Sequence, residues 1–383
     1  MKSDKPKYEI PSMEEIKKIP RNGFNVISTF SGCGGSCLGY RIAGFKILWA
    51  SEFIPEAQEV YKLNHPDSYL DKRDIRKVNP GEILKQIGLK KGEIDLMDGS
   101  PPCASFSTAG KRSKYWGEVK KYSSTKQRVD DLFFEYARIL KGLQPKVFVA
   151  ENVSGLIKGV AKGYFKIILQ ELKDCGYNVS AKVLDAQWLG VPQMRQRLIF
   201  IGVRNDLGIR PEYPKPLKYR YSVKDALPWI VTIGSSNGFG SSKQVASTYP
   251  YHTVGTSPQS GNSLARFIEA ETDISKYAIG REWDKLKPGD KSDKYINLVK
   301  PGLDSPSPCI TQTGGIRSAA GVVHPMEKRK FSIQELKRIC AFPEDFILTG
   351  TYSQQWERLG RAVPPVMMAK IAEVIREGIL EKI

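Results

Sequence analysis

The chain has 383 residues, enough for one large domain or two of ordinary size around a substantial core. Hydrophobic residues make up 40% and charged residues 26%, which excludes a disordered chain, and no apolar run reaches the roughly 20 residues of a membrane helix. The 59 Lys and Arg against 41 Asp and Glu leave a net charge of +18. This surplus favours a polyanionic partner, nucleic acid first, although an ordinary basic protein would show the same balance.

The first 22 residues form a basic extension without the apolar segment of a secretory signal. We therefore expect a cytoplasmic protein with reduced thiols. The six cysteines form no CxxC pair and there are only three histidines, so no spacing is typical of a zinc site. We expect chemistry without a metal.

Residues 23–205 alternate short β-branched runs with amphipathic stretches, which is the pattern of βαβ units in a mostly parallel sheet. The expected strands are 25–30, 47–51, 94–98, 147–150, 178–184 and 198–203. One expected helix begins at Gly34, and three others span 56–64, 125–142 and 163–175. The pattern predicts an α/β domain.

A second module is predicted to begin at residue 206, because four prolines between 211 and 228 interrupt any helix and 234–244 is rich in Gly and Ser. Aromatic and basic residues interleave over 213–224. That composition is typical of a surface that grips nucleic acid, and equally of a solvated loop. Helical periodicity returns at 332–340 and 365–383.

The first expected strand runs into a glycine turn at 30–35, where missing side chains let the backbone approach a cofactor. Glu52 lies twenty residues past Gly32, where an acid accepts the hydroxyls of an adenosine ribose. Together these features favour NAD or S-adenosylmethionine. Asp74 is suited either to accept a hydrogen bond from the adenine amino group or to cap a helix.

The strand at 94–98 is followed by Pro101, Pro102 and Cys103. Two prolines fix the backbone and present the thiol at the carboxyl edge of the sheet, where ligand sites of open α/β folds lie. This favours a nucleophile over a buried structural cysteine. Glu151 follows the next strand at the same edge, where a partly protonated carboxyl would act as an acid toward a heterocyclic nitrogen.

These segments, in this order, resemble the DNA (cytosine-5) methyltransferase family over about four fifths of the chain. The matching motifs are Phe30 to Gly35, Pro101-Pro102-Cys103, Glu151-Asn152-Val153 and the QxRxR segment 193–197. Residues 329–346 also resemble the segment that supports the family's recognition domain. The resemblance implies a Rossmann-like S-adenosylmethionine-dependent methyltransferase domain with a smaller, irregular target recognition domain.

The resemblance also implies how the chain is divided and which residues act. Residues 23–205 would form the catalytic and cofactor-binding domain, 206–318 the target recognition domain, and 319–383 the return to the catalytic domain with a C-terminal helix. The implied catalytic residues are Cys103, Glu151, Arg195 and Arg197. The implied cofactor residues are Phe30, Gly32, Gly34, Gly35, Glu52, Phe53, Asp74, Ile75, Pro101, Arg361, Ala362 and Val363. The residues expected to meet DNA are Ser107, Lys111 and Arg112, in a mobile loop over 104–126, with Lys218 and Arg220.

The family's chemistry explains these residue types, because C5 of cytosine is not nucleophilic until something adds to C6. The Cys103 thiolate would make that addition while Glu151 hydrogen-bonds N3 and the exocyclic amine. The base is out of reach inside a duplex and must be flipped into the pocket. Arg195 and Arg197 would orient the flipped base or its phosphate and support Glu151, unless they form only strand-flanking salt bridges.

One position departs from the family: Arg361 stands where the closing Gly-Asn-x-Val-Pro motif has asparagine. In one interpretation Arg361 faces solvent or pairs with a protein carboxylate, and methyl transfer is intact. In the other it binds the carboxylate of carboxy-S-adenosylmethionine, and the product is 5-carboxymethylcytosine. The sequence leaves both open.

Other functions explain less of the sequence. A nicotinamide oxidoreductase accounts for neither the proline-fixed cysteine nor the charge, and the intact motifs argue against an inert DNA-binding protein. A tRNA cytosine-5 methyltransferase uses the same chemistry, but the large insert after residue 204 favours double-stranded DNA. We expect a bacterial or phage-encoded monomer with no membrane partner. A restriction endonuclease or a downstream modification enzyme would be its functional partner.

Overall fold

The computed structural model describes residues 5–102, 120–122, 125–127, 131–231 and 271–383. The chain forms two compact units. The sheet unit comprises Glu14–Ala186, Gln196–Pro216 and Ala362–Ile383. The loop-rich unit comprises Met1–Met13, Gln187–Arg195 and Leu217–Arg361.

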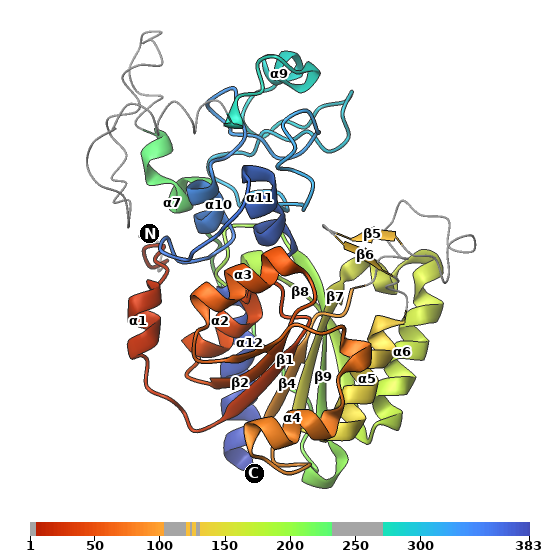
Figure 1. Ribbon diagram of the computed structural model, residues 1–383. Coiled ribbons are helices and arrows are strands. Elements are labelled where there is room, and N and C mark those ends of the chain that lie inside the picture. Colours follow the sequence, from red (N-terminus) through yellow and green to blue (C-terminus); the bar gives the residue numbers. More distant parts are fainter. Residues whose placement is uncertain (1–4, 103–119, 123–124, 128–130, 232–270) are drawn as a thin grey trace. The chain divides into compact units, whose positions relative to one another are not determined.

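A seven-stranded sheet in the order β3-β2-β1-β4-β7-β9-β8 is the centre of the sheet unit (Figure 1). Its strands are β1 (Asn25–Thr29), β2 (Lys46–Ser51), β3 (Tyr69–Asp71), β4 (Leu96–Gly99), β7 (Val147–Val153), β8 (Tyr177–Asp185) and β9 (Gln196–Arg204). The pairs from β3 to β7 are parallel, and β9 is antiparallel to both β7 and β8. The expected α/β class with a mostly parallel sheet is confirmed.

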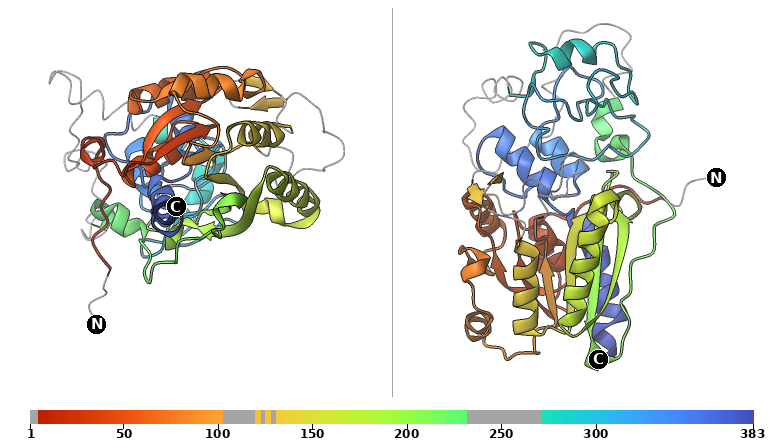
Figure 2. Two further views of the ribbon diagram at one scale, coloured as in Figure 1. Left: turned by 90° about the horizontal axis from the view of Figure 1, so that it is seen from below. Right: turned by 90° about the vertical axis from the view of Figure 1, so that its right-hand side faces the viewer.

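Helices cover both faces of this sheet, as Figure 2 shows. The helices of the unit are α1 (Met13–Lys18), α2 (Gly35–Ile42), α3 (Pro55–Asn64), α4 (Pro80–Ile87), α5 (Leu132–Leu143), α6 (Lys162–Asp174) and α12 (Pro365–Gly378). Helices α3, α4 and α12 each begin with proline, whose fixed φ suits a first helical position. Helix α12 packs against α2, while α4, α5 and α6 follow one another on the other face.

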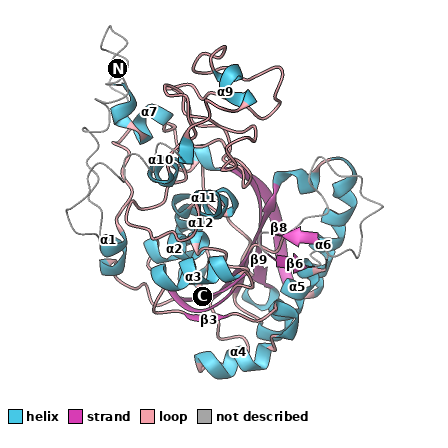
Figure 3. Ribbon diagram, turned by 45° about the horizontal axis from the view of Figure 1, so that its top comes forward, coloured by secondary structure: helices cyan, strands magenta, loops and turns pink. Residues whose placement is uncertain are grey.

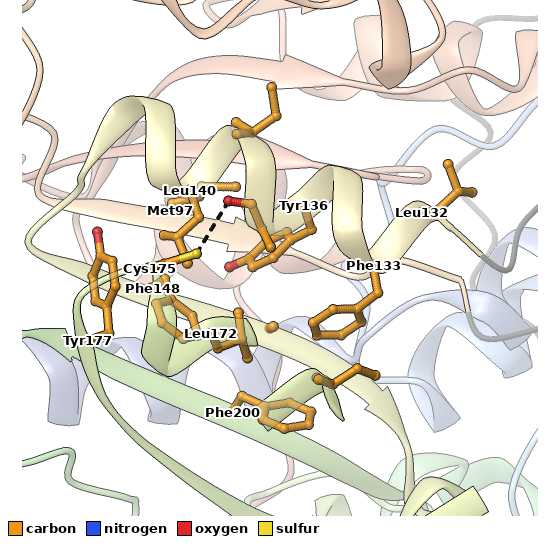
Figure 4. Packing of buried hydrophobic residues seen from close by; sticks show 14 of the residues in the cluster. Met97, Leu132, Phe133, Tyr136, Leu140, Phe148, Leu172, Cys175, Tyr177 and Phe200 are labelled. Atoms are coloured by element: carbon orange, nitrogen blue, oxygen red, sulfur yellow. Dashed lines mark hydrogen bonds between the residues drawn. The ribbon is translucent and has the colours of Figure 1, made fainter. Parts of the chain in front are cut away.

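The main core lies between the sheet and α5 and α6 (Figure 4). Phe133 of α5 meets Phe200 of the sheet at a ring-centroid distance of 6.0 Å, and Tyr136 meets Phe148 at 6.2 Å, both in a favourable edge-to-face arrangement. The Cys175 thiol contacts the Ala137 carbonyl oxygen at 3.6 Å. This packing fixes β4 and β7, the two strands that carry the candidate site.

The crossing of α2 and α12 depends on Gly39. A Cβ there would lie 2.5 Å from the Met368 Cβ and 2.6 Å from the Pro365 carbonyl oxygen. Alanine ordinarily stabilises a helix relative to glycine, but here it would overpack the crossing. We therefore expect Gly39→Ala to lower the free energy of unfolding by about 1–3 kcal/mol in denaturant titrations. The exposed Lys166→Ala in α6 should change it by less than about 0.5 kcal/mol; equal stability of G39A and the parent would contradict this packing.

The loop-rich unit has short elements joined by long loops, as the mostly loop-coloured chain around α9 in Figure 3 shows. Its helices are α7 (Val223–Ala226), α9 (Ala278–Trp283), α10 (Ile333–Ile339) and α11 (Tyr352–Arg361). A small core of Ile274, Ile279, Leu298 and Val323 lies beside α9. Because regular elements are few, side-chain hydrogen bonds define much of this unit.

The structure corrects several expected bounds. The helix expected over 125–142 begins only at Leu132, where its apolar face begins, and Thr125–Gln127 (β6) pairs instead with Lys120–Tyr122 (β5) in an antiparallel ladder. The C-terminal helix ends at Gly378, before a short 3₁₀ turn. The helix expected at 332–340 is α10, capped by a reciprocal pair between Ser332 and Glu335.

Candidate active site

The turn after β1 has the backbone that a cofactor loop requires. Phe30, Gly32 and Gly34 have φ values of 54°, 57° and 90°, in the left-handed region that favours glycine. A Cβ on Gly34 would lie 2.2 Å from Nε2 of His65, so no side chain fits there. A Cβ on Gly32 would meet nothing within 4 Å, so the loop is open on that side. Gly35 then begins α2.

Glu52 fixes this loop from the end of β2. Its carboxylate accepts hydrogen bonds of 2.7 Å from the backbone N–H groups of Gly32 and Ile54, and Gln58 donates to the Glu52 carbonyl oxygen at 2.8 Å. A carboxylate offers about four acceptor positions, so a buried Glu52 beside an open glycine loop fits the hydroxyls of an adenosine ribose. The residues present therefore suit an adenosine cofactor.

Three further predicted cofactor residues lie just after the ends of β2 and β3. Phe53 is 37% exposed, as a stacking side chain would need to be. Asp74 caps a 3₁₀ turn by accepting from the Arg76 N–H and forms an ion pair with that side chain at 3.0 Å. Ile75 is buried. The structure thus shows the capping role that the sequence left open for Asp74.

Glu151 lies near the end of β7 and pairs with Arg197 of the neighbouring strand β9. Arg197 Nε is 2.7 Å from a Glu151 carboxylate oxygen, and both side chains are largely buried. Arg197 also donates to the Gln196 carbonyl oxygen at 2.8 Å. A charge-assisted contact of this length holds the carboxylate in one orientation at the sheet edge.

The segment that leads to Cys103 lies beside Glu151. Gly99 of β4 is in register with Ala150 of β7, and Asn152 Nδ2 donates to the Pro101 carbonyl oxygen at 3.3 Å. Cys103 itself, with Ser107, Lys111 and Arg112, lies outside the described residues. Pro101, two residues before Cys103 in the sequence, therefore lies beside Asn152, the residue that follows Glu151.

Arg195 belongs to the loop-rich unit, although it is only two residues from Arg197. It is 1% exposed and donates to the carbonyl oxygens of Gly360 and Ile310 at 2.9 and 3.1 Å. The residue that the structure pairs with Glu151 is thus Arg197. In the same unit, Arg361 Nε is 2.8 Å from the Glu357 carboxylate, one turn earlier in α11.

The remaining predicted residues divide between the units. Ala362 and Val363 are in the sheet unit, where Val363 is buried just before α12. In the loop-rich unit, Lys218 is exposed. Arg220 donates to the Gln187 side chain at 2.9 Å and stacks 4.8 Å from the centre of the Trp188 ring, a flat cationic and aromatic surface suited to nucleic acid.

One buried acid at this edge was not among the residues predicted from the sequence: Asp98 in β4, which is 1% exposed. The sequence feature that could have identified it is an aspartate within an otherwise apolar predicted strand. In the described ranges, no group of three or more His, Cys, Asp or Glu residues could hold a metal ion. Within those ranges, no helix has the length and apolar character needed to cross a membrane.

A family model described as C-5 cytosine-specific DNA methylase matches residues 24–377. The chain therefore belongs to the C-5 cytosine-specific DNA methylase family. It is 31% identical over 362 residues to the type II methyltransferase M1.HphI of Haemophilus parahaemolyticus, covering 91% of this chain and 86% of that protein. It is 30% identical over 379 residues to M.NgoPII of Neisseria gonorrhoeae, covering 95% and 99%.

Solved structures share the fold. A prophage-encoded protein of the DNA modification methyltransferase type from E. coli superposes with a TM-score of 0.68 at 21% identity, covering 94% of this chain and all of that one. A DNMT2 variant from Spodoptera frugiperda gives 0.61 at 18%, covering 92% and 99%. The expected Rossmann-like methyltransferase fold and the family resemblance are confirmed, and S-adenosylmethionine is the cofactor that this family implies.

Proposed function

We propose that this protein transfers a methyl group from S-adenosylmethionine to C5 of a flipped cytosine in double-stranded DNA. The observation that carries the proposal is the Glu151–Arg197 pair beside Pro101, at the sheet edge where Glu52 also supports the glycine loop. Ligands of open α/β folds bind at this edge. The cofactor supplies an electrophilic carbon attached to a positive sulfur.

Each residue then has a separate task. The Cys103 thiolate adds to C6, and Glu151 hydrogen-bonds N3 and the exocyclic amine, where charge develops as the thiolate adds. With the cofactor bound, C5 would attack the methyl carbon, the bond from that carbon to sulfur would break to leave S-adenosylhomocysteine, and loss of the C5 proton would expel the thiolate. Arg197 orients the Glu151 carboxylate. Arg195 supports the segment at Gly360, to whose carbonyl oxygen it donates a hydrogen bond.

Target choice belongs to the second module. We propose that residues 206–318 recognise the DNA sequence, that Lys218 and Arg220 contact the DNA, and that Ser107, Lys111 and Arg112 meet phosphates near the flipped base. The relatives named above are type II methyltransferases. This supports a role in DNA modification beside a restriction endonuclease. We propose further that the enzyme is cytoplasmic and acts as a monomer.

Substrate class is tested by offering duplex DNA and tRNA separately with radiolabelled S-adenosylmethionine. We expect label in DNA, at cytosine, and none above background in tRNA. Label in tRNA alone would overturn the choice of DNA while leaving the chemistry unchanged. Absence of label from both would contradict the proposed activity.

The carboxymethyl alternative depends on Arg361 meeting a carboxylate on the transferred group. The Glu357 carboxylate, 2.8 Å from Arg361 Nε, already provides a protein partner of that kind. This contact favours methyl transfer from ordinary S-adenosylmethionine.

We therefore expect Arg361→Asn to leave the cofactor preference unchanged, within about twofold, when S-adenosylmethionine and its carboxy derivative compete. A guanidinium that bound the cofactor's carboxylate would contribute roughly 1.5–3 kcal/mol, so its loss would shift the preference at least about tenfold. The measurement is the ratio of 5-methylcytosine to 5-carboxymethylcytosine in DNA, with Glu357→Gln as the matched variant. A tenfold shift in the Arg361→Asn variant alone would favour the carboxymethyl function.

A further inference from the structure

The buried carboxyl group of Asp98 has no cationic partner among the described residues. Asp98 is in β4, five residues before Cys103, and is 1% exposed. Its oxygens accept hydrogen bonds from Ser28 Oγ at 3.0 Å and from the Tyr40 hydroxyl at 3.2 Å. No described Lys, Arg or His forms a salt bridge with it. Removing a carboxylate from water without a cation is costly.

The groups that face Asp98 do not offset a negative charge. The titratable ones are Cys37 and Tyr40 of α2, Tyr61 of α3, Tyr136 of α5 and Glu151 of β7. Burial raises the pKa of the Cys37 thiol to about 12 and the pKa values of the three tyrosines well above their usual range, so these four groups are neutral. Glu151 carries a charge of the same sign and is paired with Arg197.

Burial, opposed by the two hydroxyl groups, raises the pKa of Asp98 to about 7, and the Glu151 charge adds to the rise. The group is therefore divided between its acid and its carboxylate near neutral pH. A nearby positive charge would favour the carboxylate.

Asp98 is joined to the cofactor loop by a short chain of hydroxyl groups. Ser28 of β1 is in register with Asp98, and Ser31 Oγ donates to Ser28 Oγ at 3.1 Å. Ser31 lies between Phe30 and Gly32, two of the three left-handed residues of the loop. The carboxyl group thus lies under the loop, at the carboxyl edge of the sheet.

We propose that Asp98 is the counter-charge for the cofactor's sulfonium, and that binding of S-adenosylmethionine releases the Asp98 proton to solvent. This inference rests on the proposed function, because it takes S-adenosylmethionine as the ligand of the loop. The O–H bond of the acid breaks, the proton goes to water, and the carboxylate remains. S-adenosylhomocysteine lacks the positive sulfur and should not trigger the release.

Calorimetric titration of the full chain at about pH 6.5, in two buffers of different ionisation enthalpy, counts the protons released. With S-adenosylmethionine we expect about half a proton or more per site, and with S-adenosylhomocysteine close to none. At about pH 6.5 both ligands have a protonated amino group and an ionised carboxylate, so titration of their amino-acid ends contributes little with either. Affinity for S-adenosylmethionine should rise about thirtyfold between about pH 5.5 and about pH 8.5, because the cation binds the ionised form.

Asp98→Asn should bind S-adenosylmethionine without proton release and with an affinity that does not change over this pH range. The matched control is Asp95→Asn, a buried aspartate at the opposite end of β4 that is paired with Lys146 at 2.7 Å. That variant should keep the release. The comparison of two ligands in the parent needs no variant and remains decisive if Asp98→Asn does not fold.

Four outcomes would overturn the inference. Equal proton release with both ligands would show that ionisation of Asp98 does not depend on the sulfonium charge. Release that persists in Asp98→Asn would assign the proton to another group. Failure of the parent to bind either ligand would overturn the proposed function as well, whereas binding without release would overturn this inference alone.

Discussion

Replacing Cys103 by serine should abolish transfer to DNA, with a loss of at least about 10³-fold in rate. A serine hydroxyl has a far higher pKa than a thiol, so it would not add to C6 of cytosine, and C5 would stay unreactive. The measurement is incorporation of labelled methyl into duplex DNA at saturating S-adenosylmethionine.

The same variant should no longer form a covalent complex with DNA that contains 5-fluorocytosine, because the fluorine blocks release only after the thiolate has added. Binding of unmodified duplex DNA, measured by fluorescence anisotropy, should stay within about threefold of the parent, since phosphate contacts dominate that affinity. Transfer by C103S at the parent's rate would refute the covalent mechanism.

Replacing Glu151 by glutamine should lower the transfer rate by roughly 10²–10⁴-fold, the range expected for loss of a positioned acid or base. The amide keeps the shape of the side chain but loses the charge that Arg197 orients. Single-turnover kinetics with saturating DNA separate this effect from weaker binding.

Glu135→Gln provides the matched control for Glu151→Gln. Glu135 forms an ion pair of 2.7 Å with Arg138 on α5, so the same chemical change is made in a similar pair away from the site. We expect its transfer rate to stay within about twofold of the parent. Equal rate losses in the two variants would indicate general destabilisation and would contradict a catalytic role for Glu151.

The central strands of the sheet were predictable from the sequence because they are buried on both faces, whereas the three-residue strand β3 was not among the expected strands. Residues 147–150 of β7 and 198–203 of β9 are wholly buried, and they read as nearly continuous apolar runs between turn residues. The helix expected from residue 125 was wrong at its start because residues 125–127 lack an apolar stripe and pair as a strand instead. Helices α4 and α11 were not predicted: α4 is short, and α11 is polar over much of its surface.

The site was predictable in outline because the carboxyl ends of parallel strands share one edge, which brings the glycine loop, Glu52, Pro101 and Glu151 to the same side of the sheet. The division of labour between the two arginines was not predictable. Arg195 and Arg197 would share one face of a continuous strand, but β9 begins only at Gln196. Arg195 therefore lies before the strand, and it is Arg197 of β9 that pairs with Glu151 of the neighbouring strand β7.

The hydrogen-bond partners of Asp98 could not be predicted from the sequence, for a different reason. Its two hydrogen-bond partners, Ser28 and Tyr40, are 70 and 58 residues away in the chain, and they meet it through the register of β1 with β4 and the packing of α2. Hydrophobic patterning gives the period of a strand but not the register between strands, so neither contact follows from the sequence.

The most direct test is nucleoside mass spectrometry of duplex DNA after incubation with the purified protein and equal amounts of S-adenosylmethionine and its carboxy derivative. We expect 5-methylcytosine as the product, at a level that falls to background in Cys103→Ser. A product that is mainly 5-carboxymethylcytosine would contradict methyl transfer, and a methyl group on any base other than cytosine would contradict the cytosine-5 chemistry itself.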